Sequence, residues 1–94
     1  MPDLRLEDFA GSVGERFEAR AGEVVVTLEL QAAQPVRAPS VREGSPFVLH
    51  WLGPPEPVLP QAIYEIRRGE EAYEIFIVPV GRNEQGVLYE AVFN

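Results

Sequence analysis

The sequence contains no cysteine and no lysine, and it has one histidine and one tryptophan. The missing cysteine excludes disulfides, thiolate metal sites and a cysteine nucleophile. One histidine is too few for a histidine metal cluster and leaves no spare base for a Ser-His-Asp arrangement. We therefore expect that the protein is not an enzyme and that it has no catalytic residue, cofactor or metal.

Positive charge is also scarce, since eight arginines stand against 15 acidic residues and the net charge of the 94-residue chain is 8 − 15 = −7. Nucleic acids and anionic membrane surfaces both bind clusters of Lys or Arg, so we expect neither as a partner. The chain also lacks the ~18-residue apolar run of a membrane span, and residues 1–9 do not resemble a signal peptide. These absences predict a cytoplasmic protein.

Glycine and proline are plentiful and punctuate the chain, and the segments between them alternate or run apolar over short lengths. This pattern is typical of antiparallel strands. It predicts one all-β domain over residues 1–94, a small antiparallel β-barrel or sandwich of about six strands. The exception is residues 4–13, where Leu6, Phe9, Ala10 and Val13 have helical spacing. They predict a short N-terminal helix that plugs one end of the sheet.

Three glycine-containing turns predict hairpins: one at Ala21-Gly22, one with Gly69-Glu70 as a two-residue loop, and one over residues 81–86. In each hairpin we choose the register that collects the apolar side chains on one face. The opposing pairs are then Arg20 with Glu23, Arg68 with Glu71, and Pro79 with Val87. The last strand is expected to be integral to the fold because its apolar residues alternate to Phe93.

Two segments interrupt this pattern. Residues 32–45 are weakly periodic and contain prolines, which predicts a mobile loop. Residues 53–60 contain four prolines, which lack the N–H donor that a sheet interior requires. Between the two lies a strand over residues 47–52, with Phe47, Leu49 and Trp51 on one side. Its other side is also mostly apolar, which predicts partial burial on both faces.

Four sequence blocks carry a resemblance: Phe47-x-Leu49-x-Trp51-x-Gly53-Pro54, Leu59-Pro60-Gln61-x-x-Tyr64, Phe76-x-Val78-Pro79-Val80-Gly81 and Tyr89-Glu90-Ala91-Val92-Phe93-Asn94. Together they resemble a family of small bacterial proteins known only as a domain of unknown function. Members often sit near genes for phage tail-collar-like proteins, so the resemblance implies an accessory or structural role in a tail-like assembly. The family has no established functional residues that could be carried over.

This chain departs from the family at one block, where Gln61-Ala62-Ile63-Tyr64 replaces the usual Gln-Gly-Thr-Tyr. A glycine with positive φ in the relatives would leave an alanine strained at this position. We therefore expect Ala62 to have ordinary extended backbone.

Two side-chain features have chemical interest. His50 lies between Leu49 and Trp51 and is expected to be a half-buried sheet residue. In the predicted second hairpin Glu65 lies opposite Glu74, and two like charges in that position are destabilising. A cation could bridge them, and a raised carboxyl pKa could supply a general acid. The interpretation we favour is that Arg67, diagonal to Glu74, neutralises a solvated pair.

The proline-rich loop and its neighbours are the predicted partner contact. Prolines restrict an exposed loop before binding, and apolar side chains beside them could enter a partner's groove. The predicted contact residues are Trp51, Pro54, Pro55, Glu56, Pro57, Val58 and Leu59. In the competing interpretation Val58 and Leu59 fold inward and close the end of the barrel.

The leading functional hypothesis is a non-catalytic protein-interaction or structural accessory module, associated with a phage-tail-like assembly through an unidentified protein partner. The oligomeric state is left open, and a homo-oligomer is among the alternatives. The first rival is a small-ligand-binding barrel that uses Trp51, Tyr64, Tyr73 and Tyr89 as stacking surfaces. The second rival is a carboxylate-based enzyme that uses Glu65 and Glu74.

Overall fold

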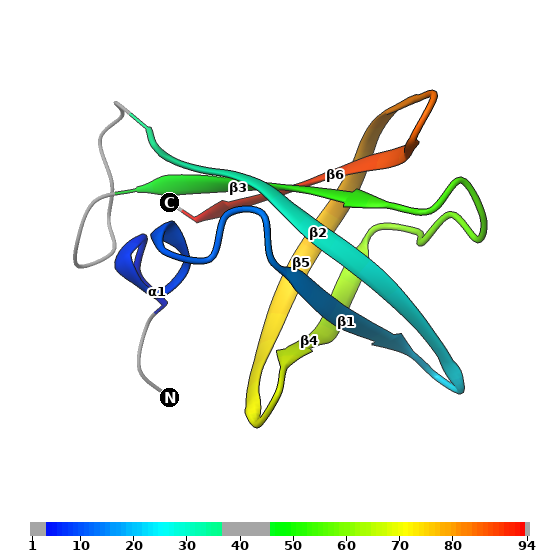
Figure 1. The fold of residues 1–94 in the computed structure, drawn as a ribbon, viewed down its shortest axis with the longest axis horizontal. Coiled ribbons are helices and arrows are strands. Elements are labelled where there is room, and N and C mark those ends of the chain that lie inside the picture. The colour runs from blue at the N-terminus through cyan, green and yellow to red at the C-terminus, as the bar shows by residue number, and fades with distance from the viewer. Residues whose placement is uncertain (1–3, 37–45, 94) are drawn as a thin grey trace.

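The computed structural model describes residues 4–36 and 46–93. The described chain forms six antiparallel strands and one helical turn (Figure 1), which confirms the predicted all-β class. The elements are α1 (Glu7–Ala10), β1 (Arg16–Ala21), β2 (Val24–Pro35), β3 (Phe47–Gly53), β4 (Ala62–Arg68), β5 (Glu71–Asn83) and β6 (Gly86–Phe93). The last strand does run to Phe93, as its alternation predicts.

The strands close into a barrel in the order β1-β2-β3-β6-β5-β4, and β4 pairs back onto β1. Of the two predicted architectures, barrel and sandwich, the structure has the barrel. Each strand pairs with its sequence neighbour except β3 and β4, which lie on opposite sides of the ring. Residues 54–61 must therefore pass across one end of the barrel to connect them (Figure 1).

The N-terminal helix is shorter than the predicted segment 4–13, because only Glu7–Ala10 is helical and residues 11–14 form turns. A single turn cannot present four residues on one side. Phe9 is fully buried, Leu6 is half-buried, and Ala10 and Val13 are exposed. The predicted plug nevertheless forms, because the Phe9 ring packs 5.1 Å from that of Tyr73, between ring centroids.

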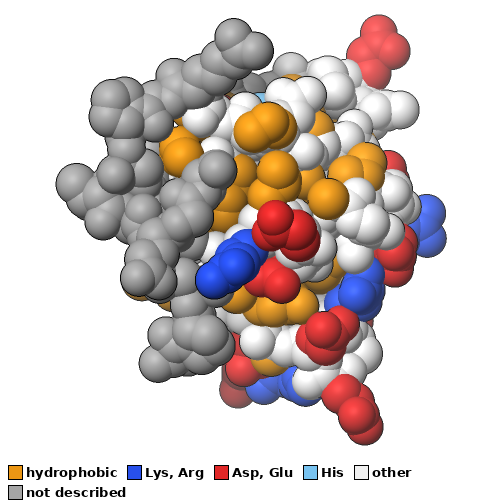
Figure 2. All heavy atoms as spheres, turned by 90° about the vertical axis from the view of Figure 1, so that its left-hand side faces the viewer, with side chains coloured by type: hydrophobic (Ala, Val, Ile, Leu, Met, Phe, Trp, Pro, Cys, Tyr) orange, Lys and Arg blue, Asp and Glu red, His pale blue; other side chains and the backbone are white. Residues whose placement is uncertain are grey.

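This plug lies at the end of the barrel opposite residues 54–61 (Figure 1). Figure 2 looks at the α1 end and shows hydrophobic side chains at the surface between acidic and basic ones.

The second hairpin has the predicted register, with Arg68 opposite Glu71 around the loop Gly69-Glu70. The other two hairpins are displaced from the prediction by two residues. In the first, Ala21 pairs with Val24 around Gly22-Glu23, where the positive φ of Gly22 suits the first position of a two-residue turn. The predicted turn at Ala21-Gly22 is therefore wrong.

In the third hairpin the predicted pairing of Pro79 with Val87 is also wrong, since Pro79 pairs with Tyr89. A bulge between Pro79 and Gly81 lets β5 continue to Asn83. The Asn83 side-chain oxygen then accepts hydrogen bonds from the backbone N–H groups of Gln85 (2.8 Å) and Gly86 (3.1 Å). Both errors preserve the side of the sheet on which each residue lies, because a shift of two residues keeps the alternation.

Strand β2 extends further than predicted, since residues 32–35 pair with β3 up to Pro35 opposite Phe47. The predicted loop over 32–45 is therefore wrong for 32–35, and residues 37–45 lie outside the described residues. Pro35 ends the strand, where its missing N–H removes no interior hydrogen bond.

The core fills the barrel with inward-facing side chains from all six strands. Its largest fully buried members are Trp51, Tyr89, Phe9, Phe17, Phe47, Leu28, Leu30, Leu49, Ile66, Ile75 and Ile77. Strand β3 follows the prediction, with one side buried and Val48, His50 and Leu52 half-buried on the other. Ala62 lies in β4 with ordinary strand backbone, as expected from the departing block.

Candidate functional site

The barrel interior is apolar. Among residues 4–36 and 46–93, Ser12 is the one polar or charged residue that is buried, apart from the tyrosines and the tryptophan of the core. Trp51 and Tyr89 are fully buried and Tyr64 is nearly so, while Tyr73 is half-buried. Burial raises the pKa of Tyr64 above its ordinary value, and it raises that of Tyr73 as well. These aromatic rings therefore fill the core and do not offer a shared stacking surface to solvent.

Trp51 packs edge-on against Phe17, with ring centroids 5.0 Å apart at 85°. Its indole Nε1 is buried and has no hydrogen-bond partner within the part of the chain that the structure describes. Trp51 is therefore a core residue, and its burial keeps it from touching a partner directly.

The proline-rich loop is divided between inward and outward side chains. Leu59 is buried, and its backbone N–H donates a 2.9 Å hydrogen bond to the Tyr89 hydroxyl inside the barrel end. Val58 stays exposed, as do Pro55, Glu56 and Pro57. The inward-folding interpretation therefore holds for Leu59 and the outward one for Val58.

Two further hydrogen bonds fix this loop to the barrel rim. The Arg82 guanidinium donates to the Pro55 carbonyl at 2.9 Å, and the Tyr64 hydroxyl donates to the Pro60 carbonyl at 2.5 Å. A shallow hollow of about 400 Å³ lies where the loop meets the outer surface of β2, lined by residues that include Val25, Thr27 and Pro57. The loop is therefore a fixed rim with four exposed residues, Pro55 to Val58, on its outer side.

The two facing glutamates lie where the register prediction put them, with Glu65 opposite Glu74 on the outer surface of the barrel. Arg67 lies 3.9 Å from Glu65 rather than compensating Glu74, and Arg20 on β1 stands opposite Glu65 on its other side. Within the described residues, no three His, Asp or Glu side chains are grouped closely enough to hold a metal ion. The pair therefore retains like-charge repulsion that is compensated at Glu65 more than at Glu74.

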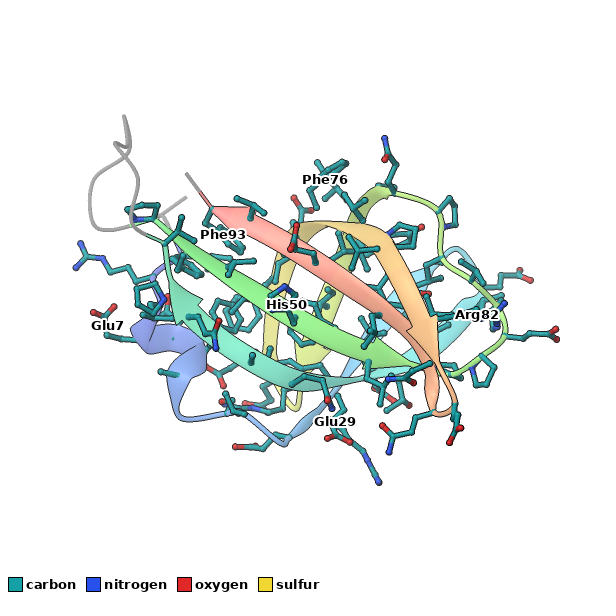
Figure 3. The ribbon with its side chains drawn as sticks, turned by 90° about the horizontal axis from the view of Figure 1, so that it is seen from above. Glu7, Glu29, His50, Phe76, Arg82 and Phe93 are labelled. Carbon is teal, nitrogen blue, oxygen red and sulfur yellow. The ribbon has the colours of Figure 1, made fainter. Side chains whose placement is uncertain are left out.

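His50 is half-buried, as expected, and lies on the outer surface of β3. Its Nε2 is 3.0 Å from a carboxylate oxygen of Glu90, which stands opposite it on β6. Figure 3 looks onto β3 and β6 and shows His50 in the middle of this surface. The contact links the two strands across the outside of the barrel.

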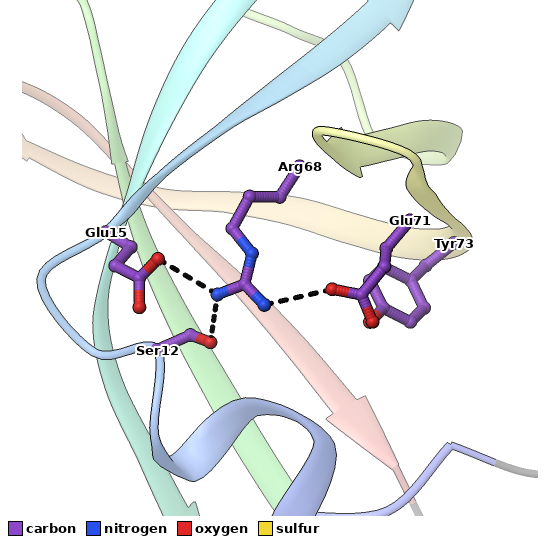
Figure 4. A network of polar contacts seen from close by, with 5 residues as sticks. All are labelled: Ser12, Glu15, Arg68, Glu71 and Tyr73. Atoms are coloured by element: carbon purple, nitrogen blue, oxygen red, sulfur yellow. Dashed lines mark hydrogen bonds and ion pairs between the residues drawn. The ribbon is translucent and has the colours of Figure 1, made fainter.

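Arg68 organises a further polar network, near the α1 end of the molecule (Figure 4). Its guanidinium donates to the Ser12 hydroxyl and to carboxylate oxygens of Glu15 and Glu71, both at 3.0 Å. The hydrogen bond with Glu71 is the main reason that the pKa of Arg68 is raised. Because the contacts with Ser12 and Glu15 join the segment after α1 to the β4–β5 hairpin, the network is a structural clamp.

The feature that sequence reasoning missed is a group of outward apolar residues on four adjacent strands, which we name the outer apolar face. Ile63 on β4 is opposite Phe76 on β5, and Val92 on β6 is opposite Val48 on β3. Val78 joins the two pairs, because it follows Phe76 on β5 and is opposite Glu90 on β6. The exposed fractions are 66% for Ile63, 51% for Phe76 and 51% for Val92. Figure 3 shows Phe76 pointing away from the barrel.

A signal for this face is present in the sequence, since Ile63, Phe76 and Val92 occupy strand positions between the inward-facing residues. What the sequence does not provide is the order in which the strands lie side by side. Only that order brings β5, β6 and β3 together and turns scattered outward residues into one surface.

Among the described residues there is no helix long and apolar enough to cross a membrane. Comparison with known proteins finds no matching curated protein and no matching solved structure. A family model does match, over residues 4–93, which is nearly the whole chain. The chain therefore belongs to the family described as a domain of unknown function, DUF6916.

Proposed function

We propose that this protein is a non-catalytic interaction module that serves as a structural accessory within a larger, phage-tail-like assembly. The observation that carries the proposal is the outer apolar face. Its large apolar side chains remain exposed although the barrel has a complete buried core of other residues. Exposed apolar surface of this kind marks contact sites between proteins. The tail-like character of the assembly rests on the family resemblance alone.

The filled interior supports an interaction role over a ligand-binding one. Barrels of eight strands have an interior just wide enough for side chains to fill, and this barrel has six. Its interior is occupied by Trp51, Tyr89 and the aliphatic residues around them. A partner would therefore bind to the outer surface of the barrel, because side chains fill its interior.

The proline-rich loop is a second contact surface in this proposal, through its exposed residues Pro55, Glu56, Pro57 and Val58. The hydrogen bonds from Arg82 and Tyr64 hold the loop at both ends, so little conformational entropy remains to be lost on binding. Leu59, another of the predicted contact residues, is buried and bonded to Tyr89, so it holds the loop from inside, whereas Trp51 is buried in the core.

The test is co-expression of the chain with the products of the genes that adjoin its own, followed by size-exclusion chromatography with light scattering. We expect a complex of defined stoichiometry. A photoreactive amino acid placed at position 58 or 76 would then identify the contact, since a chain without lysine gives amine-reactive cross-linkers no side chain to react with. A chain that stays free of every neighbour would contradict the proposal.

A loop variant separates the two roles of residues 54–59. If the loop is a contact, the combined change Glu56→Arg and Val58→Ala weakens the complex and leaves the melting temperature unchanged, because both side chains are exposed. If the same change lowers the melting temperature and the complex survives, the loop is a lid and contributes no contact.

A further inference from the structure

We propose that the outer apolar face binds an amphipathic helix of a partner protein, with an apolar stripe flanked by Lys or Arg. This inference rests on the proposed interaction function and names the chemistry of the partner. It uses Val48, Ile63, Phe76, Val78 and Val92 as the apolar contact.

The charges around this face are acidic on both sides. Along β4 and β5, the next outward residues after Ile63 and Phe76 are Glu65 and Glu74, which stand opposite each other. On the other side Glu90 is opposite Val78 and next to Val92. A partner that covers the apolar residues must therefore approach three carboxylates, and Lys or Arg side chains beside its apolar stripe would meet them.

The Glu65–Glu74 pair adds a specific reason for a basic partner. Like charges directly opposite each other on a sheet are destabilising. Among the described residues, Arg67 lies 3.9 Å from Glu65 and Arg20 stands opposite Glu65, so both cations are on the Glu65 side of the pair. A cation brought by the partner to Glu74 would relieve the repulsion. The repulsion between Glu65 and Glu74 is present in the free protein and is removed in the complex, and its removal increases the affinity for the partner.

The same charges disfavour a second copy of the chain as the occupant. In a two-fold dimer the same surface patch lies on both sides of the interface, so acidic borders meet acidic borders. Two chains of net charge −7 would also repel each other at long range. His50 offers little relief, because it is already in contact with Glu90.

The spacing of the apolar residues suits a helix that lies across the strands. Neighbouring strands are about 4.8 Å apart, and successive turns of an α-helix are about 5.4 Å apart. A helix with apolar residues at i, i+4, i+7 and i+11 would place about one of them over each of the four strands. An extended peptide presents same-side residues about 6.7 Å apart and would match the four strands less well.

The probe is a synthetic helical peptide of about 16 residues with leucines at those four positions and lysines on both sides of the stripe. A matched peptide carries glutamates in place of the lysines. Each is titrated into the ¹⁵N-labelled full chain, and affinity and contact site are read from amide chemical shifts. Sedimentation of the chain alone measures self-association.

We expect the lysine peptide to shift amides on β3, β4, β5 and β6 and to bind at least about tenfold more tightly than the glutamate peptide. Phe76→Ser should weaken it about tenfold or more. The matched control is Val25→Ser, because Val25 on β2 has the same exposed fraction, 51%, and lies outside the face. It should leave binding unchanged. The double variant Glu65→Gln and Glu74→Gln should weaken the lysine peptide severalfold and leave the glutamate peptide no weaker. Thermal melts of all variants establish that they are folded.

Four results with the peptides and the isolated chain would overturn the inference. One is equal binding of the lysine peptide to the Phe76→Ser and Val25→Ser variants, which would mean that the peptide binds only through nonspecific attraction to an acidic protein. The others are equal affinity for both peptides, no binding of the lysine peptide, and self-association that Phe76→Ser abolishes. If adjoining gene products form their complex with wild type and with Phe76→Ser alike, the module exists and this face is not its contact. If they form none, the proposed function itself fails.

Discussion

The two ends of the barrel are closed by different kinds of contact. At the α1 end, aromatic side chains meet one another: Phe9 lies 6.4 Å from Phe47, between ring centroids, and Phe47 stacks on Phe93 at 4.4 Å. At the proline-loop end, two backbone segments approach each other closely beside the buried Leu59. A Cβ atom on Gly86 would lie 1.9 Å from the Gly53 carbonyl oxygen.

This difference predicts which changes each end tolerates. Side chains that pack against side chains can shift and fill part of a lost volume, so the cost of a change depends on how far the site relaxes. Two backbone segments in contact have no such freedom, because Gly53 and Gly86 belong to paired strands. The loop end should therefore be the more sensitive to a small added group, whereas the α1 end should lose stability when a large buried side chain is removed.

The largest effect is expected for Gly86→Ala. The added methyl group would overlap the Gly53 oxygen, and separating the two would break the pairing of β3 with β6. We expect a loss above about 4 kcal/mol, which is most of the stability of a small domain. The control is Gly81→Ala, since a Cβ there meets nothing within 4 Å. Urea unfolding of both variants checks this, and equal midpoints would show that the close approach is not rigid.

The second effect tests the α1 end through Phe9→Ala. Phe9 is fully buried between Phe47 and Tyr73, so its removal leaves a cavity. We expect a loss of about 3 kcal/mol, at the lower end for a buried phenylalanine because this end can relax toward solvent. Replacing the exposed Val13 by alanine is the control. If Phe9→Ala costs less than about 1 kcal/mol, the helical turn does not close the barrel.

A smaller effect is expected for Tyr89→Phe at the loop end. The change removes the hydroxyl that accepts the hydrogen bond from the Leu59 N–H and leaves that buried donor without a partner. The expected cost is about 1 to 3 kcal/mol. Tyr73→Phe serves as the matched change at the α1 end, because its hydroxyl makes an exposed 3.3 Å contact with Glu71. A cost for Tyr73→Phe as large as that for Tyr89→Phe would erase the contrast between the ends.

The sequence predicts the contents of the core better than the pairing around it. The Gly69-Glu70 hairpin is predicted in full, because the predicted loop has its glycine, with positive φ, at the first of the two loop positions. In the first and third hairpins a register displaced by two residues keeps the same face, so Phe17 and Val87 are buried in either case. Alternation alone cannot distinguish such registers, and the bulge after Pro79 leaves no periodic signal.

The candidate site is less predictable for a related reason. Proline content identifies the exposed loop, but nothing in the loop sequence marks Leu59 rather than Val58 as the inward residue. The Leu59 N–H bonds to the Tyr89 hydroxyl, which comes from a strand 30 residues away. The outer apolar face depends on the strand order of the closed barrel. Long-range pairing of this kind is not encoded in a local pattern.

The smallest effect concerns the side wall between the two ends, where Glu65 faces Glu74. Replacing both by glutamine removes like-charge repulsion, and it also removes the contact of Glu65 with Arg67, which is long and exposed. These contributions oppose each other, so we expect stability unchanged or raised by about 0.5 kcal/mol at most. Added salt should reduce the difference, because it screens charges at the surface. Urea unfolding at low and high salt, with elemental analysis of the purified wild type, provides the measurement. A loss above about 1 kcal/mol would mean that the pair stabilises the wall, and a metal lost with both carboxylates would mean that a cation bridges them.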